Sequence, residues 1–211
     1  MEKRKWFKMG CRFIYLVRHG EIDKESDKRT YIGQIDLDLN RQGIKQAKNL
    51  GDKLKDIRFE RIYSSSLKRA IKTAKIICAH HNVELEKIDE FREIKLGEWE
   101  GKSFDDIKKY YPNEFKERGE NIIHYCVPGG ENFYQCNQRA MKKFHRILSK
   151  VDGNILIVAH AGVNRLILCN VLGISLDKIF QIPQDYGCFN TIIDNRGKLK
   201  VKNINKNPQN T

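Results

Sequence analysis

The chain has 211 residues, which is enough for one domain with a sizeable core. Hydrophobic residues make up 40% of it and charged residues 32%, as is typical of globular proteins, and no apolar run approaches the roughly 20 residues of a membrane span. We therefore expect no membrane partner. Because the basic N-terminus carries no apolar secretory segment, we also expect a cytoplasmic protein.

The formal net charge of +13 raises the question of a nucleic-acid partner. Much of this surplus lies at the two ends. Residues 1–8 hold four bases and one acid, and residues 196–211 hold five bases and no acid. We expect these ends to be flexible and solvated, to aid solubility and to steer anionic substrates, and we expect no nucleic-acid partner.

The cysteines are widely scattered, with no Cys-x-x-Cys pair and no cysteine and histidine cluster at zinc spacing. This pattern predicts reduced, buried thiols and no metal site. The residues are Cys11, Cys78, Cys126, Cys136, Cys169 and Cys188.

The first predicted element is a buried strand at Phe13–Val17, an apolar run without alternation that leads directly into Arg18-His19-Gly20. A side chain that follows such a strand lies where open α/β sheets hold their ligands. A histidine in that place can act as a nucleophile, and an arginine beside it can clamp an anion.

Two amphipathic helices are predicted next. The first begins after a capping Asn40, and the second covers residues 67–78 after a short strand at Arg61–Tyr63. Arg69 lies off the apolar stripe of the second helix. We therefore expect its guanidinium to point away from the core.

Residues 98–130 contain few apolar residues of strand type and are predicted to form an insertion over the sheet edge, able to act as a lid. Within it, a helical segment runs from Phe104 to Arg118 and is interrupted by Pro112. Ser103, just before this segment, has the spacing of a helix cap.

A second buried strand is predicted at Ile155–Ala159, and it also leads into a histidine, His160. The following helix, Gly162–Leu172, is apolar nearly all round and is ended by Gly173. The two predicted parallel strands thus carry histidines at equivalent ends.

A longer helix is predicted from Phe133, and two final strands are expected near residues 189–193 and 199–201, joined by a turn. The alternation of strands and helices predicts one α/β domain over residues 1–211. We expect a three-layer α/β/α sandwich with a mainly parallel sheet.

Four motifs occur in order along the chain: Arg18-His19-Gly20, Arg69 near the start of a helix, Glu93, and His160-Ala161-Gly162. In these motifs, over roughly residues 11–195, the chain resembles the histidine phosphatase superfamily, in its phosphoglycerate mutase-like branch. The resemblance implies a metal-independent enzyme without a cofactor, in which His19 attacks phosphorus and forms a phosphohistidine. It also implies that a backbone carbonyl holds the other ring nitrogen of His19.

Two arginines and two histidines that converge at strand ends would form a strongly cationic pocket, which suits a phosphoryl group. Arg18 and Arg69 are expected to brace the phosphoryl oxygens in the transition state, and His160 to be a further donor. The amides of Ala161 and Gly162, at the start of a helix, are expected to assist.

By the same resemblance, Glu93 is the expected proton donor to the leaving oxygen and then the base that activates water. Glu98 and Glu100 lie on the same loop and are rivals for this role, although exposed loop acids are the commoner outcome for both.

The loop at residues 31–36 resembles the family's substrate-side loop, in which Gly33 and Gln34 approach the ligand. The sequence departs from the family just before this loop. Many relatives have Trp-Asn shortly after Arg-His-Gly-Glu, with the asparagine on the phosphate, whereas residues 22–26 here are Ile-Asp-Lys-Glu-Ser. Ser26 and Arg29 are the candidates to replace this asparagine.

Glu93 and His160 are only 67 residues apart, and the shortness of this insertion favours hydrolysis over the phosphoryl transfer of mutases. The short segments at residues 97–101 and 128–131 resemble those of small bacterial phosphatases of the α-ribazole-5′-phosphate phosphatase type. The sequence therefore predicts a phosphomonoesterase acting on a small phosphorylated metabolite, with α-ribazole-5′-phosphate as a candidate.

Two alternatives remain open from the sequence. One is phosphoryl transfer of the phosphoglycerate mutase type, and the other is a non-catalytic module that binds an anion or nucleic acid. The expected partner is a small-molecule phosphate ester, and both a monomer and a homodimer are compatible with the sequence.

Overall fold

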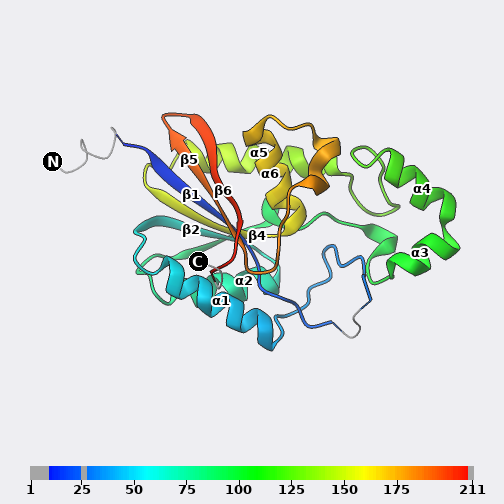
Figure 1. The fold of residues 1–211 in the computed structure, drawn as a ribbon, viewed down its shortest axis with the longest axis horizontal. Coiled ribbons are helices and arrows are strands. Elements are labelled where there is room, and N and C mark those ends of the chain that lie inside the picture. The colour runs from blue at the N-terminus through cyan, green and yellow to red at the C-terminus, as the bar shows by residue number, and fades with distance from the viewer. Residues whose placement is uncertain (1–9, 25–27, 209–211) are drawn as a thin grey trace.

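The computed structural model describes residues 10–24 and 28–208, in which a six-stranded sheet lies between two layers of helices (Figure 1). The strand order is β3-β2-β4-β1-β5-β6. The first four strands in this order are parallel, and β5 and β6 run antiparallel to their neighbours. The strands are β1 (Arg12–Arg18), β2 (Phe59–Ser65), β3 (Leu85–Ile88), β4 (Asn154–Ala159), β5 (Phe189–Asn195) and β6 (Lys198–Lys206).

Two helices cover each face of the sheet, α1 and α2 on one side and α5 and α6 on the other (Figure 1). Successive side chains along a strand point to opposite faces of the sheet. Leu16 packs into the core beneath α5 and α6, and Val17 packs against α1 and α2. The predicted α/β sandwich is confirmed. The helices are α1 (Arg41–Leu54), α2 (Lys68–Cys78), α3 (Phe104–Tyr110), α4 (Pro112–Glu120), α5 (Phe133–Leu148) and α6 (Ala161–Leu172), with short 3₁₀ turns at Asp89–Phe91, Gly97–Trp99 and Leu176–Gln181.

The predicted helix ends are confirmed by their capping contacts. The Asn40 side chain accepts a hydrogen bond from the amide of Gly43 at 2.8 Å, and Gly173 ends α6 in the left-handed conformation with φ of 67°. Pro112 divides the insertion into two helices by standing at the first turn of α4, where its missing N–H costs nothing.

Two features differ from the sequence predictions. The edge strand β3 was not predicted, because its short sequence Leu-Glu-Lys-Ile contains no apolar run and exposes its two charged side chains. The predicted strand at residues 199–201 extends further than expected: β6 covers Lys198–Lys206 and pairs with β5, including residues expected to belong to a flexible basic end, because the side chains of Leu199, Val201 and Ile204 pack against the core.

The expectation of buried thiols is only partly correct. The structure buries three cysteines, leaves Cys78 half-buried, and exposes Cys11 and Cys126, which lie in loops outside the regular elements. The buried thiols are Cys136, Cys169 and Cys188.

The carboxyl ends of β1, β2 and β4 meet at the same edge of the sheet because these strands are parallel. Helices α3 and α4 lie beyond this edge, apart from the helices that cover the sheet (Figure 1). No helix in the described part of the chain is long and apolar enough to cross a membrane.

Candidate active site

A cavity of about 540 Å³ opens at the carboxyl edge of the sheet. β1 delivers Arg18 and His19 to its wall, and Arg69 enters from the first turn of α2. Glu93 lies on the loop that follows β3, and Gly162 is at the start of α6. The structure thus brings to one cavity residues as far apart in the sequence as Arg18 and Gly162.

His19 is a neutral imidazole whose two ring nitrogens differ in their hydrogen bonds. Its Nδ1 lies 2.7 Å from the carbonyl oxygen of Gly20 and donates to it, so Nε2 keeps its lone pair. Burial, and then the charges of Arg69 and Arg18, lower the pKa of His19 well below 6.5. This backbone carbonyl is the kind of holder that the family resemblance implied.

Arg69 lies beside His19, and contrary to the prediction from its helix it is almost fully buried. Its Nη1 donates to the carbonyl of Ile35 at 2.6 Å and its Nη2 to that of Gly33 at 2.7 Å. Its Nε donates a hydrogen bond to Nε2 of His19 at 3.3 Å. The loop carbonyls replace water around the guanidinium, which is why an arginine off the apolar stripe can still be buried.

Arg18 is fixed by a loop that the sequence analysis did not identify. Its Nη1 donates to the carbonyl of Gln184, and its guanidinium lies over the ring of Tyr186, 3.7 Å from the ring centre. The amide of Gly187 donates to the carbonyl of His19 at 3.1 Å. Residues 184–187 form no motif, and only their contacts reveal the role.

His160 is fully buried, and its ring centre lies 5.0 Å from that of His19. Nε2 of His160 lies 2.7 Å from Oγ of Ser65, which also accepts a hydrogen bond from the amide of Leu67. Nδ1 of His160 has no partner among the described residues. Burial, and then the charge of Arg69, lower the pKa of His160 well below 6.5.

Glu93 is positioned by the start of α6. Its Oε2 accepts a hydrogen bond from the amide of Gly162 at 3.1 Å, and a side chain at Gly162 would come within 2.5 Å of its Oε1. The two rival acids differ from it. Glu100 is tied to the amides of Gln34 and Leu96, and Glu98 is exposed away from the cavity.

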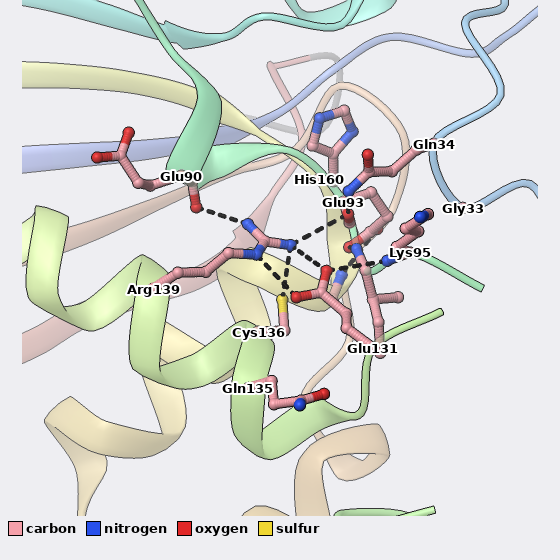
Figure 2. A network of polar contacts seen from close by, with 12 residues as sticks. Gly33, Gln34, Glu90, Glu93, Lys95, Glu131, Gln135, Cys136, Arg139 and His160 are labelled. Carbon is pink, nitrogen blue, oxygen red and sulfur yellow. Dashed lines mark hydrogen bonds and ion pairs between the residues drawn. The ribbon is translucent and has the colours of Figure 1, made fainter. Parts of the chain in front are cut away.

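Arg139 of α5 anchors the loop that carries Glu93 (Figure 2). It forms an ion pair with Glu131 at 2.6 Å and donates to the carbonyls of Glu90 at 2.7 Å and Glu93 at 3.2 Å. Sequence reasoning missed this residue. The sequence feature that could have indicated it is Glu131, the last residue of the Pro-Gly-Gly-Glu segment at residues 128–131. Glu131 binds both Arg139 and the amide of Lys95.

The substrate-side residues are only partly placed as predicted. Gly33 lines the cavity, whereas the Gln34 side chain donates to the carbonyl of Glu93 and does not line it. Ala161 lines the cavity, as does Gly162, whose amide is already engaged by Glu93. Ser26 lies outside the described residues.

The outer part of the cavity is mostly aromatic and apolar. Helices α3 and α4, from the insertion predicted between residues 98 and 130, contribute to its wall. Three arginines also face this part, namely Arg29, Arg118 and Arg165. In the described chain no group of three histidine, cysteine, aspartate or glutamate residues could hold a metal ion. The aromatic members of the wall are Tyr31, Phe104, Phe115, Phe133, Phe180 and Tyr186.

Comparison with known proteins agrees with this geometry. Residues 14–207 match the model of the histidine phosphatase superfamily, branch 1. The chain belongs to this superfamily. The histidine phosphatase described here is 28% identical over 194 residues to the adenosylcobalamin/alpha-ribazole phosphatase of Escherichia coli K12, covering 91% of this chain and 95% of that protein.

Two further comparisons, one of sequence and one of fold, agree with this assignment. The histidine phosphatase is 33% identical over 162 residues to a metal-independent phosphoserine phosphatase of Arabidopsis thaliana, covering 75% of this chain and 68% of that one. The solved structure of a putative alpha-ribazole-5′-P phosphatase from Escherichia coli K-12 superposes with a TM-score of 0.86 at 26% identity, covering 94% and 98% of the two chains. The chain is thus a phosphomonoesterase of this superfamily.

Proposed function

We propose that this histidine phosphatase releases phosphate from a small phosphorylated metabolite through a phosphohistidine at His19. The observation that carries the proposal is the state of this residue: a buried neutral imidazole whose Nδ1 is held by the Gly20 carbonyl and whose Nε2 keeps its lone pair and accepts a hydrogen bond from Nε of Arg69. A nucleophile must be deprotonated and aimed before the substrate arrives, and both conditions are met here.

In the first step, the Nε2 lone pair of His19 attacks phosphorus while the bond to the leaving oxygen breaks. Arg18 and Arg69 stabilise the charge on the phosphoryl oxygens, and His160 is the further donor. Glu93 delivers a proton to the leaving oxygen, so that the organic product departs as an alcohol.

In the second step, the carboxylate of Glu93 takes a proton from water as the water oxygen attacks phosphorus. The P–N bond breaks, its electron pair returns to Nε2 of His19, and inorganic phosphate leaves. The two steps together consume one water and restore the enzyme.

The test is turnover of p-nitrophenyl phosphate in the presence of EDTA. We expect His19→Gln to lose at least about 10³-fold in kcat, because the nucleophile is removed. The matched control is His145→Gln, an exposed position on α5, which should keep wild-type turnover. A wild-type protein that is inactive in EDTA would contradict the proposal, as would turnover by His19→Gln at the wild-type rate.

The names of the relatives supply two candidate substrates, α-ribazole-5′-phosphate and phosphoserine. The aromatic outer wall would suit the ring system of the first. Phosphate release from a panel of phosphorylated metabolites separates the two. The same panel tests the mutase alternative, because a mutase would interconvert 2- and 3-phosphoglycerate instead of releasing phosphate.

A further inference from the structure

We propose that Arg29, Arg118 and Arg165, here called the outer arginines, form a second anion-binding site, and that the preferred substrate carries a carboxylate or a second phosphate beyond the phosphoryl group that is removed. The proposal rests on the phosphatase function above and specifies its substrate class. It concerns recognition only, and it adds no chemical step.

The outer arginines come from three separate segments and face one cavity. Arg29 precedes the substrate-side loop, Arg118 belongs to α4 and Arg165 to α6. The guanidinium of Arg29 lies 4.0 Å from the ring centre of Phe104, which stacks on Tyr31 at 3.9 Å. Arg118 lies 5.6 Å from the same Tyr31 ring, so an aromatic stack connects the two cations.

The outer arginines have no counter-ion within the described chain. None of them forms an ion pair there, and Arg29 and Arg118 donate no side-chain hydrogen bond to a described residue, whereas the Nε of Arg165 donates to the carbonyl of Ile182. By contrast, Arg12 and Arg139 are paired with acids. Arg118 and Arg165 are half-buried, and Arg29 is exposed. A half-buried guanidinium group without an acid is costly, and an incoming anion would compensate it.

The electrostatic environment agrees with this geometry. Burial lowers the pKa of Arg118, and the positive charge of Arg29 lowers it further. Burial, and then the charge of Arg18, also lower the pKa of Arg165, with a smaller effect from Arg29. These like charges repel one another, which means that the outer cavity attracts an anion.

The two acids that line the cavity only partly offset this charge: the charge of Glu93 raises the pKa of Arg165, but neither acid forms an ion pair with an outer arginine in the described chain. Glu93 is engaged by the start of α6, and Asp177 is exposed and hydrogen-bonded to Ser175. The phosphoryl group itself is assigned to Arg18 and Arg69. The anion that the outer arginines fit must therefore be a second group on the substrate, and guanidinium pairs well with both carboxylate and phosphate.

This inference distinguishes between the two candidate substrates. Phosphoserine carries a carboxylate beside its phosphate, whereas α-ribazole-5′-phosphate carries a single phosphate as its only anion. We therefore expect substrates of the first kind to be preferred. A cavity of about 540 Å³ suits a small metabolite of this kind.

The test compares kcat/KM for 3-phosphoglycerate and glycerol 3-phosphate, which differ in a carboxylate at one end. We expect the wild type to prefer 3-phosphoglycerate at least about tenfold, and Arg118→Gln to remove most of this preference. The control is Lys116→Gln, which removes an exposed charge from the same helix and should keep the wild-type ratio. Arg29→Gln is the second variant and should lower the ratio in the same direction.

Hydrolysis of p-nitrophenyl phosphate by the wild type separates the two proposals. If that activity is absent, the phosphatase function itself is overturned. If it is present but the wild type shows no preference for 3-phosphoglycerate, only the second anion site is overturned. An unchanged ratio in Arg29→Gln and in folded Arg118→Gln, verified by circular dichroism, would also overturn it.

Discussion

Three carboxylates within eight residues show how the environment of a side chain decides its role. Glu93 accepts a hydrogen bond from the Gly162 amide and lines the cavity. Glu100 accepts hydrogen bonds from two backbone amides, and Glu98 is exposed to solvent. All three belong to the same stretch of chain after β3. Only Glu93 combines a fixed position with access to the cavity.

We predict that Glu93→Gln lowers kcat/KM for an alkyl phosphate about 10²-fold or more, because the leaving alkoxide needs a proton. The loss for p-nitrophenyl phosphate should be much smaller, because p-nitrophenolate leaves without one. Steady-state kinetics on the two substrates measures the difference. Glu98→Gln should leave both values unchanged, and equal losses on the two substrates in Glu93→Gln would rule out the acid role.

At the scale of elements, the loop that carries Glu93 is shaped by its neighbours more than by its own sequence. Gly97, with φ of 53°, packs against the backbone of Pro128 and Gly130 so closely that no side chain would fit. Arg139 of α5 ties the same loop to the helix layer (Figure 2). A helix on one face of the sheet thereby positions an acid at the edge of the sheet.

We predict that Arg139→Met lowers the free energy of unfolding by about 2 kcal/mol, because it removes the ion pair with Glu131 and two hydrogen bonds to backbone carbonyls. It should also lower kcat about tenfold with little change in KM, because Glu93 loses its fixed position. Urea unfolding and steady-state kinetics measure the two effects. Lys142→Met, at an exposed position of the same helix, is the control. Lost stability with an unchanged kcat would show that Arg139 has only a structural role.

At the scale of the whole molecule, the parallel sheet brings two neutral histidines to one buried place. Burial is the main cause that lowers the pKa of both His19 and His160 below 6.5, and nearby arginines lower it further. In the unfolded chain both rings take up a proton below that pH, whereas in the folded protein they stay neutral. Stability is therefore lost as the pH falls through the unfolded value.

We predict that the free energy of unfolding decreases below about pH 6.5, by about 1.4 kcal/mol per pH unit for each of these histidines. His81, which is half-buried and also has a lowered pKa, adds a smaller effect of the same sign. Urea unfolding between pH 5 and 7.5 measures the slope. His19→Gln should reduce it by about 1.4 kcal/mol per pH unit, and the exposed His145→Gln should not. A flat profile for the wild type would refute the prediction.

The amino-acid sequence by itself determined the buried strands β1 and β4, the capped helix α1, the apolar helix α6 and the motifs that end these elements. Each depends on a local signal, such as an apolar run, a helical period or a capping residue, that neighbours in the chain provide. The edge strand β3 was missed because it has no such signal.

Only the tertiary structure decided how the candidate site is completed. The carbonyls that bury Arg69, the loop that holds Arg18 and the contact of Arg139 with Glu93 all join segments more than 30 residues apart. No periodicity in the chain encodes such contacts, because they arise where parallel strands end together and loops from different layers meet. The sequence alone therefore predicted His19 as the nucleophile, and folding determined what surrounds this residue.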